Sequence, residues 1–152
     1  MDKERKYLAL CEEGARLFST CRKRQYYAII IAPNGRVVGT GYNGSPPGSQ
    51  HCVDGGCPRA QENSPSGSLY NNCVSNHAEA NAIAYSDPVS RSSGTLFVNG
   101  TPCWDCAKLI AGAGISKVVC FYDPTYEDWP RVRKHLLGWG VAVREVVNNG
   151  SV

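Results

Sequence analysis

The sequence predicts an α/β protein, a three-layer α/β/α sandwich around a mixed sheet of about five strands that begins with a β-hairpin. Three observations lead to this fold class. Two apolar, β-branched runs surround Asn34-Gly35, a strong hairpin signal. After residue 77, helix-like and strand-like patterns alternate, which implies parallel neighbouring strands with right-handed crossovers. The 152 residues, 42% of them hydrophobic, suffice for one core but not for two ordinary domains.

The elements are predicted in order along the chain. Leu8, Cys11, Ala15 and Phe18 recur close to helical spacing and predict a helix over about residues 3–19. The segment "YYAIIIAPNGRVVGTGYNG" then predicts two antiparallel strands. The remaining elements are a helix at about 77–85, a strand at 95–100, a helix at 103–113, a strand at 117–122, a helix near 129–137 and a strand at 141–147.

Between the hairpin and the second predicted helix lies a long polar segment, residues 44–76. It is rich in glycine, proline, serine and asparagine and has almost no apolar periodicity. So long an irregular stretch is uncommon in a compact domain unless something holds it in place. We therefore expect a single domain over residues 1–152, with a cysteine-rich insertion at about 44–76.

The composition favours a cytoplasmic protein that binds small anions. The first residues are charged and amphipathic, unlike a secretion signal, and no run of eighteen apolar residues occurs, so we expect no membrane association. A net charge of +3 is too small for a broad basic face, which argues against a stable nucleic-acid partner. In a reducing compartment, clustered cysteines more often bind metal than form disulfides. Of the eight cysteines, Cys11 and Cys120 lie in apolar runs and are expected in the core.

Three residues from two predicted helix starts form a candidate metal site. Cys103 and Cys106 in "TPCWDCAKLI" stand three apart in the first turn of a helix, where free N–H groups stabilise thiolates. His77 in "SNHAEANAIAYS" begins another helix that would pack beside the first. Three such ligands leave the fourth tetrahedral position of Zn²⁺ to a water, as in catalytic zinc sites, and zinc lowers the pKa of that water. Glu79 is then the expected catalytic proton carrier.

Each part of this pattern has a plainer interpretation. The two cysteines could be a redox pair, His77 a polar residue at a helix start, and Glu79 an acid that favours the positive end of the helix dipole. A structural zinc ribbon would need a second CxxC, which the sequence lacks. The combination H-x-E…P-C-x-x-C, with a strand between its halves, is specific, and it matches the signature of zinc-dependent nucleobase deaminases.

Over about residues 5–147, the chain resembles the deoxycytidylate deaminases of the cytidine deaminase-like superfamily. The resemblance rests on "STCRKRQ", "GTGYNGSPPG", "HAEANAI", and "PCWDCAKLIAGAGI" followed by "KVVCF". It implies hydrolysis of dCMP to dUMP and ammonia, which supplies dUMP for thymidylate synthesis. It also implies activation by dCTP with Mg²⁺, inhibition by dTTP, a homohexamer and, if the protein is viral, action in the host cytoplasm.

The same resemblance assigns further residues. The substrate-binding positions that it implies are Asn43 at the sugar, backbone groups of Ala78 and Thr101 at the base edge, and Tyr126 near the 5′-phosphate. The basic run and the glycine-containing loop "GYNGSPPG" suggest Arg22, Arg24 and Gly44 as effector-binding positions. Asn43 could equally be an Asn-Gly turn residue, and Tyr126 simply an exposed tyrosine. Tyr27 departs from the family, which usually has a small residue there, so packing, assembly or effector response is in question.

A second, structural Zn²⁺ would explain the polar insertion. The remaining cysteines at element ends or in polar loops are Cys21, Cys52, Cys57 and Cys73. A closed tetrahedral site would fasten the insertion to the end of the first helix, and some phage and bacterial relatives carry such a metal near these positions. His51 could replace one cysteine, and unligated thiols are the alternative.

Two other functions use parts of the same pattern. A tRNA or polynucleotide deaminase shares the zinc motif but needs a basic stripe along its substrate strand. The densest basic run here is residues 22–24, which suits a solvated helix end or a bound effector triphosphate. A catalytically idle, zinc-stabilised nucleotide-binding regulator has no need of the proton carrier Glu79, which the chain retains. A free deoxynucleotide is therefore the favoured substrate.

Overall fold

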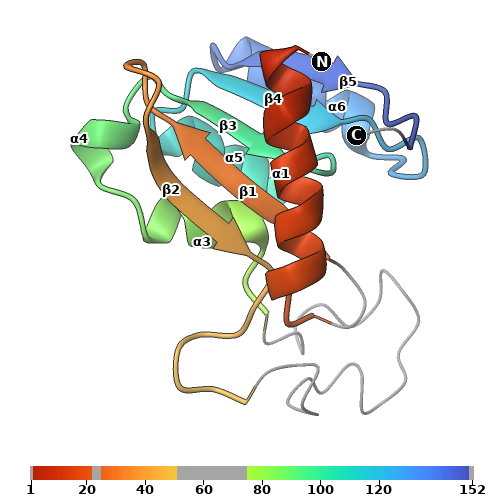
Figure 1. The fold of residues 1–152 in the computed structure, drawn as a ribbon. Coiled ribbons are helices and arrows are strands. Elements are labelled where there is room, and N and C mark those ends of the chain that lie inside the picture. The colour runs from red at the N-terminus through yellow and green to blue at the C-terminus, as the bar shows by residue number, and fades with distance from the viewer. Residues whose placement is uncertain (1, 22–24, 51–74, 151–152) are drawn as a thin grey trace.

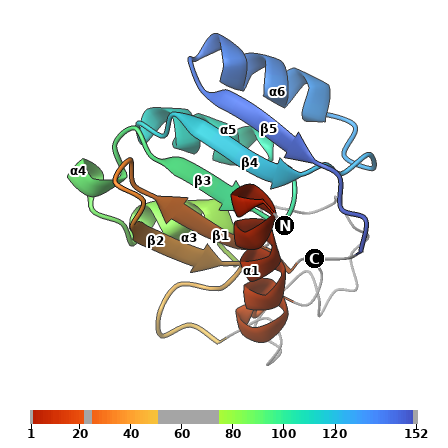
Figure 2. The same ribbon diagram turned by 45° about the horizontal axis from the view of Figure 1, so that its top comes forward.

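The computed structural model describes residues 2–21, 25–50 and 75–150 (Figure 1). A five-stranded sheet forms its centre, with the strand order β2-β1-β3-β4-β5 (Figure 2). In chain order the elements are α1 Lys3–Phe18, β1 Tyr27–Ile31, β2 Val37–Tyr42, α3 Ala78–Ala84, α4 Pro88–Arg91, β3 Thr95–Val98, α5 Trp104–Gly112, β4 Lys117–Phe121, α6 Trp129–Gly138 and β5 Ala142–Val146. Among the helices of these ranges, none has the length and apolar character that a membrane crossing requires.

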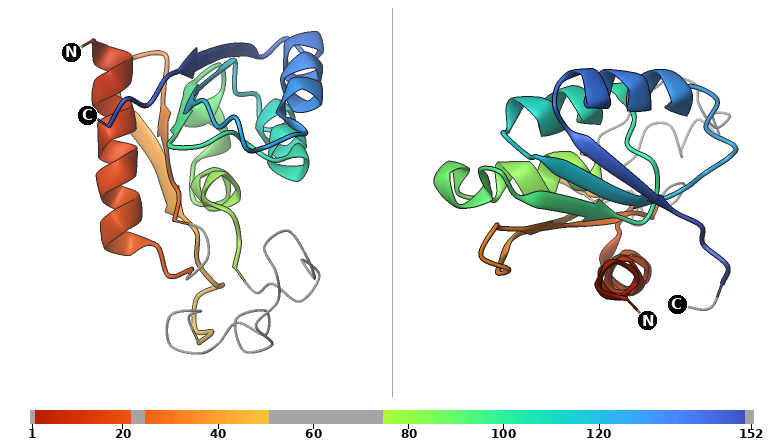
Figure 3. Two further views of the ribbon diagram at one scale, coloured as in Figure 1. Left: turned by 90° about the vertical axis from the view of Figure 1, so that its right-hand side faces the viewer. Right: turned by 90° about the horizontal axis from the view of Figure 1, so that it is seen from above.

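Two apolar clusters, one on each face of the sheet, make this a three-layer molecule. Helix α1 covers one face, and α3, α5 and α6 cover the other (Figure 3). Because successive strand residues point to opposite faces, Ile29 of β1 packs in the α1 cluster whereas Ile30 packs in the cluster beneath the other helices. Cys11 and Cys120 are buried, one in each cluster, which confirms them as core residues. The mixed sheet between helical layers confirms the predicted fold class.

The direction of the strands changes in the middle of the sheet. Strand β1 is antiparallel to both β2 and β3. Strands β3, β4 and β5 are parallel, as the alternation of helices and strands predicted. The carboxyl ends of β3 and β4 therefore lie at the same edge of the sheet as the start of β1 and the end of β2. Side chains from both halves of the chain meet at that edge.

The hairpin has a longer turn than its Asn34-Gly35 signal suggests. The Ala32 N–H donates to the Arg36 carbonyl and the Gly35 N–H to the Ala32 carbonyl, both at 2.8 Å. Gly35 has φ +87°, a left-handed conformation that glycine adopts easily. The pairing register shifts at the end of β1, next to this turn. The two predicted strands are confirmed, but the turn between them runs from Ala32 to Arg36.

Glycines in β2 allow α3 to lie directly on the strand. A Cβ atom at Gly41 would overlap the backbone of α3 at Ala78 and Ala82, and one at Gly39 would crowd the Ala82 carbonyl. Backbone atoms cannot move aside as a flexible side chain can, so any larger residue must push the helix away from the sheet. The two glycines thus set the distance between α3 and the sheet. The start of α3 carries the candidate metal ligand and proton carrier.

Gly41→Ala should therefore lower the free energy of unfolding by about 1–3 kcal/mol, as overpacking of a well-filled contact does. It should also reduce activity, because α3 must shift. Chemical denaturation measures the first effect. Gly138→Ala is the matched control, since a Cβ there meets no atom within 4 Å and alanine favours a helix. Equal unfolding free energies for wild type and Gly41→Ala would contradict this account of the packing.

Tyr27, the residue that departs from the family pattern, has its bulk accommodated by α1. Its ring lies on Gly14, where an added Cβ would come within 2.7 Å of the ring atoms. The ring also stacks on Tyr42 with a centroid separation of 6.4 Å and an interplanar angle of 17°. Packing of Tyr27 is thus explained by a glycine on the facing helix. An effect of Tyr27 on assembly or on effector response stays a prediction.

Candidate active site

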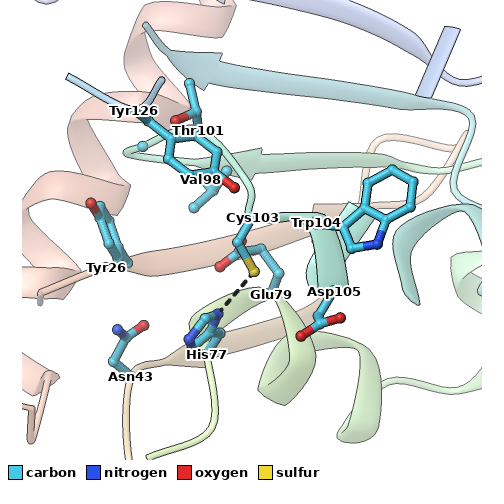
Figure 4. A pocket seen from close by; sticks show the side chains of 11 residues that line it. Tyr26, Asn43, His77, Glu79, Val98, Thr101, Cys103, Trp104, Asp105 and Tyr126 are labelled. Atoms are coloured by element: carbon cyan, nitrogen blue, oxygen red, sulfur yellow. Dashed lines mark hydrogen bonds between the residues drawn. The ribbon is translucent and has the colours of Figure 1, made fainter. Parts of the chain in front are cut away.

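A pocket opens at the edge of the sheet where the loops after β2, β3 and β4 meet the starts of β1, α3 and α5 (Figure 4). Its volume is about 360 Å³, within the range of small-molecule sites. The described residues that line it are Tyr26, Asn43, His77, Glu79, Val98, Gly100, Thr101, Cys103, Trp104, Asp105 and Tyr126. Residues from the antiparallel and parallel halves of the sheet therefore share one cavity.

The three predicted metal ligands converge on one point of this pocket. The His77 Nδ1 atom lies 3.4 Å from Cys103 Sγ and 3.3 Å from Cys106 Sγ. Tetrahedral zinc, with bonds of about 2.3 Å to sulfur and 2.0–2.1 Å to nitrogen, places such atoms about 3.6 Å apart. The donor set and its spacing therefore fit a zinc ion bound through Nδ1 of the imidazole.

The backbone around each ligand explains how they meet. His77 is the N-cap of α3 and has an extended conformation, with φ −69° and ψ 154°. The helix thus begins one residue later than predicted. Because His77 precedes the helix, its side chain leaves the backbone in a different direction from the helical side chain of Glu79. Cys103 is the N-cap of α5 and Cys106 lies in its first turn. The two helix starts bring one imidazole and two thiols together.

Electrostatic interactions prepare the sulfurs for a cation. The hydrogen bond from the Cys106 thiol lowers the pKa of Cys103, and the nearby His77 acts in the same direction. The same interaction between sulfurs raises the pKa of Cys106, together with its burial. Free N–H groups at the start of α5 further favour negative charge there. A divalent cation is the group that would allow both sulfurs to be thiolates.

Glu79 lies beside this ligand set, in the first turn of α3, and only 4% of it is exposed. Burial raises the pKa of Glu79 above its ordinary value, and the positive charge of His77 offsets this only in part. A carboxyl group whose pKa is raised in this way holds a proton more firmly than an exposed one, which suits a group that must accept a proton and pass it on. The geometry thus places an acid–base group next to a metal site in one pocket.

Asn43 connects the end of β2 to the start of α3. It is buried, and its Oδ1 accepts a hydrogen bond of 2.9 Å from the Ala78 N–H. Its side chain lines the pocket, as do Thr101 and Tyr126. Ala78 is fully buried and its N–H already has Asn43 as partner. The substrate contacts assigned to these four residues stay predictions.

Two aromatic walls of the pocket were not predicted. The Tyr26 ring lies against Gly100, where a Cβ atom would overlap it. Trp104 stands between the two cysteines in the sequence and contributes another wall. A sequence signal was available for Gly100 but not for Tyr26, since loops that follow the carboxyl ends of strands form the binding sites of α/β sheets and Gly100 lies two residues after β3. Val98 and Asp105 complete the unpredicted lining.

Several predicted residues do not join this pocket. Cys21 is buried just after α1, and Gly44 pairs with Asn76 in a short bridge with hydrogen bonds of 3.2 and 2.9 Å. The other predicted structural-zinc and effector residues lie outside the described residues, and they are Cys52, Cys57, Cys73, Arg22 and Arg24, with the alternative ligand His51. The second zinc site and the effector site stay predictions.

The sandwich fold and this combination of two thiols, an imidazole and a buried carboxylate define the class of zinc-dependent deaminases that act on nucleobases. Comparison with known families gives the particular one. Residues 1–122 match the model of the cytidine and deoxycytidylate deaminase zinc-binding region, so the chain belongs to this family.

Individual relatives support the same assignment. The deoxycytidylate deaminase of Mycobacterium phage D29 is 41% identical over 106 residues, which cover 66% of this chain and 80% of the relative. That of Schizosaccharomyces pombe is 34% identical over 131 residues, 85% of this chain but only 39% of the relative. The crystal structure of dCMP deaminase from the cyanophage S-TIM5 in complex with dCMP and dUMP is 28% identical, with a TM-score of 0.70, and the match covers 96% of this chain and 99% of that one.

Proposed function

We propose that this chain hydrolyses dCMP to dUMP and ammonia and thereby supplies dUMP for thymidylate synthesis in the cytoplasm, which is the host cytoplasm if the protein is viral. The observation that carries the proposal is the His77 Nδ1 atom within 3.4 Å of two cysteine sulfurs, beside the buried Glu79. The S-TIM5 enzyme, whose fold matches along almost the whole chain, binds dCMP and dUMP.

Different residues of the pocket have different roles in the proposed reaction. His77, Cys103 and Cys106 would hold a zinc ion, which would lower the pKa of a bound water towards neutrality. Glu79 accepts a proton from water and delivers it to N3 of cytosine while the remaining hydroxide adds to C4. Glu79 then accepts a second proton, from the new C4 hydroxyl, and delivers it to the amine, so that the C4–N bond breaks and ammonia leaves. Asn43 and Thr101 hold the sugar and the base edge. Burial of Glu79 keeps bulk water away from these proton transfers.

A substrate panel tests the proposal. The zinc-loaded chain is incubated with dCMP, dCTP, cytidine and a single-stranded oligonucleotide, and ammonia release is followed. We expect dCMP to be the preferred substrate. Preference for the oligonucleotide would instead indicate a polynucleotide deaminase. Binding of nucleotides without ammonia release from any substrate would indicate a zinc-stabilised regulator.

We also propose a second, structural zinc ion bound by Cys21, Cys52, Cys57 and Cys73. Three of these cysteines lie in a segment with almost no apolar periodicity. The fourth, Cys21, follows Thr20, whose N–H donates to the carbonyl of Asn43 at 3.0 Å, just before that segment begins. A closed tetrahedral site would hold the segment in place. Metal analysis should then give two zinc ions per chain. The Cys57→Ser variant should retain the zinc ion of the active site but have a lower melting temperature. One zinc ion per fully loaded wild-type chain would contradict this site.

Regulation is proposed to follow the family pattern, in a homohexamer that dCTP with Mg²⁺ activates and dTTP inhibits through Arg22, Arg24 and Gly44. The support is the "GYNGSPPG" loop, which connects the pocket residue Asn43 to the polar insertion, so substrate and effector segments are joined. Saturation curves for dCMP with either nucleotide test it, since effectors commonly shift affinity by about 1–3 kcal/mol. Unchanged curves would exclude this regulation, and light scattering gives the size of the assembly.

A further inference from the structure

Trp104, one wall of the pocket, carries an arginine from a different helix on its ring. The guanidinium carbon of Arg131, in the first turn of α6, lies 4.0 Å from the centre of the indole. Stacking of a guanidinium on tryptophan is a favourable cation–π contact, and it fixes the plane of the charged group. A positive charge is therefore held against the wall of the pocket, although Arg131 itself is not among the lining residues.

The hydrogen bonds of Arg131 leave part of its guanidinium available. Its Nε and Nη2 atoms donate to the two carboxylate oxygens of Asp128, at 2.8 and 2.6 Å. This fork uses one edge of the planar group, so the Nη1 amino group stays outside the ion pair. About half of the Arg131 side chain is exposed, at 47%. Ion pairs between such exposed side chains contribute little to stability, so the arginine can accept a second anion at little cost.

The charge of Arg131 also acts at the pocket itself. Tyr126 lines the cavity, and its pKa is raised by burial and by the negative charges of Cys103 and Asp128, while the positive charge of Arg131 acts in the opposite direction. Asp105 also lines the pocket and carries a negative charge. Its exposed carboxylate pairs with Lys108 at 3.0 Å. Because Lys108 already pairs with that carboxylate, a dianionic phosphate that enters here needs a further positive charge, and Arg131 is placed to supply it.

We propose that Arg131 recognises the 5′-phosphate of the substrate and so determines the preference for a nucleoside monophosphate over a nucleoside. This inference rests on the proposed function. The base and sugar would occupy the cavity between Glu79 and Asn43, and the phosphate would lie at the rim near Tyr126, within reach of the Nη1 group. Arginine suits this position because its planar donors match the oxygens of a phosphate.

Steady-state kinetics with Arg131→Gln test the proposal. We expect the KM for dCMP and the inhibition constant of the product dUMP to rise at least about tenfold, the effect of one lost hydrogen bond to a charged group. The inhibition constant of deoxyuridine, which has no phosphate, should change less than about twofold. Arg131→Lys should recover part of the affinity, since it keeps the charge but loses the fork.

Arg133→Gln is the matched control. Arg133 lies two residues further along α6, is similarly exposed, and pairs with Glu145 at 3.0 Å. It lines a neighbouring cavity that shares Tyr126 with the active-site pocket, but it does not line that pocket itself, which makes it a stringent control. Its replacement should leave all these constants within about twofold. A KM for dCMP that is unchanged in Arg131→Gln, or equally raised in Arg133→Gln, would overturn the assignment. If the wild-type protein does not deaminate dCMP, the proposed function fails instead, so the two failures are distinct.

Discussion

Replacing Glu79 by glutamine should lower dCMP turnover by about 10²–10⁴-fold, the usual contribution of a positioned proton-transfer group. Glutamine has nearly the same shape but cannot carry the proton, and all three metal ligands remain. Zinc content and melting temperature should therefore stay close to those of the wild type. Ammonia release and metal analysis on the same samples check both expectations.

The control for this variant is Glu127→Gln. Glu127 is an exposed carboxylate that does not line the pocket, so its replacement makes the same chemical change and leaves the pocket lining intact. Its turnover should match that of the wild type. If the Glu79 variant retained more than about a tenth of the activity, Glu79 would have no part in the proton transfer.

Replacing Cys106 by serine should remove the catalytic zinc ion and reduce turnover by at least about 10²-fold, because even outer-shell changes cost about 10–100-fold in metal affinity or activity. A buried hydroxyl is a much weaker ligand than a thiolate. The zinc content should fall by one ion per chain. The melting temperature should also fall, since bound metal stabilises the folded state by mass action.

Cys120→Ala provides the comparison for that experiment. Cys120 is fully buried in β4 but is not part of the ligand set, so this variant should keep its zinc ion and its activity while losing some packing energy. Comparison of the two variants thus distinguishes the effect of losing a metal ligand from the effect of losing a buried sulfur atom. Wild-type zinc content in Cys106→Ser would remove Cys106 from the site.

Hydrophobic periodicity predicted most of the fold because each helix and strand buries one face against a common core. Helix α4 was missed because its four residues, Pro88–Arg91, are too few to show a period. It is stabilised locally, as Asp87 accepts a hydrogen bond of 2.8 Å from the Ser90 N–H. The tight contact at Gly41 could not be predicted either, since nothing near it in the sequence identifies the helix that lies above it.

The metal ligands could be selected from the sequence because chemistry restricts both their types and their spacing. The structure brings His77, Cys103 and Cys106 together, with ligand atoms within 4.8 Å of one another. The pocket walls follow no such restriction. Tyr26 and Trp104 are aromatic residues of a kind that fills cores everywhere, and only the tertiary arrangement places them at the cavity. Arg131 is further removed still, because it reaches the site through its contact with Trp104.

The separation of the ligands along the chain has a consequence for the order of folding events. The imidazole donor precedes the two sulfur donors by 26 and 29 residues, and strand β3 lies between them. During synthesis, a nascent chain that has completed only the hairpin and α3 carries one of the three donors and cannot yet close this tetrahedral site. Metal can therefore bind at the active site only after β3 and the start of α5 have been synthesised. A chain with zinc bound there has already progressed beyond the hairpin and α3.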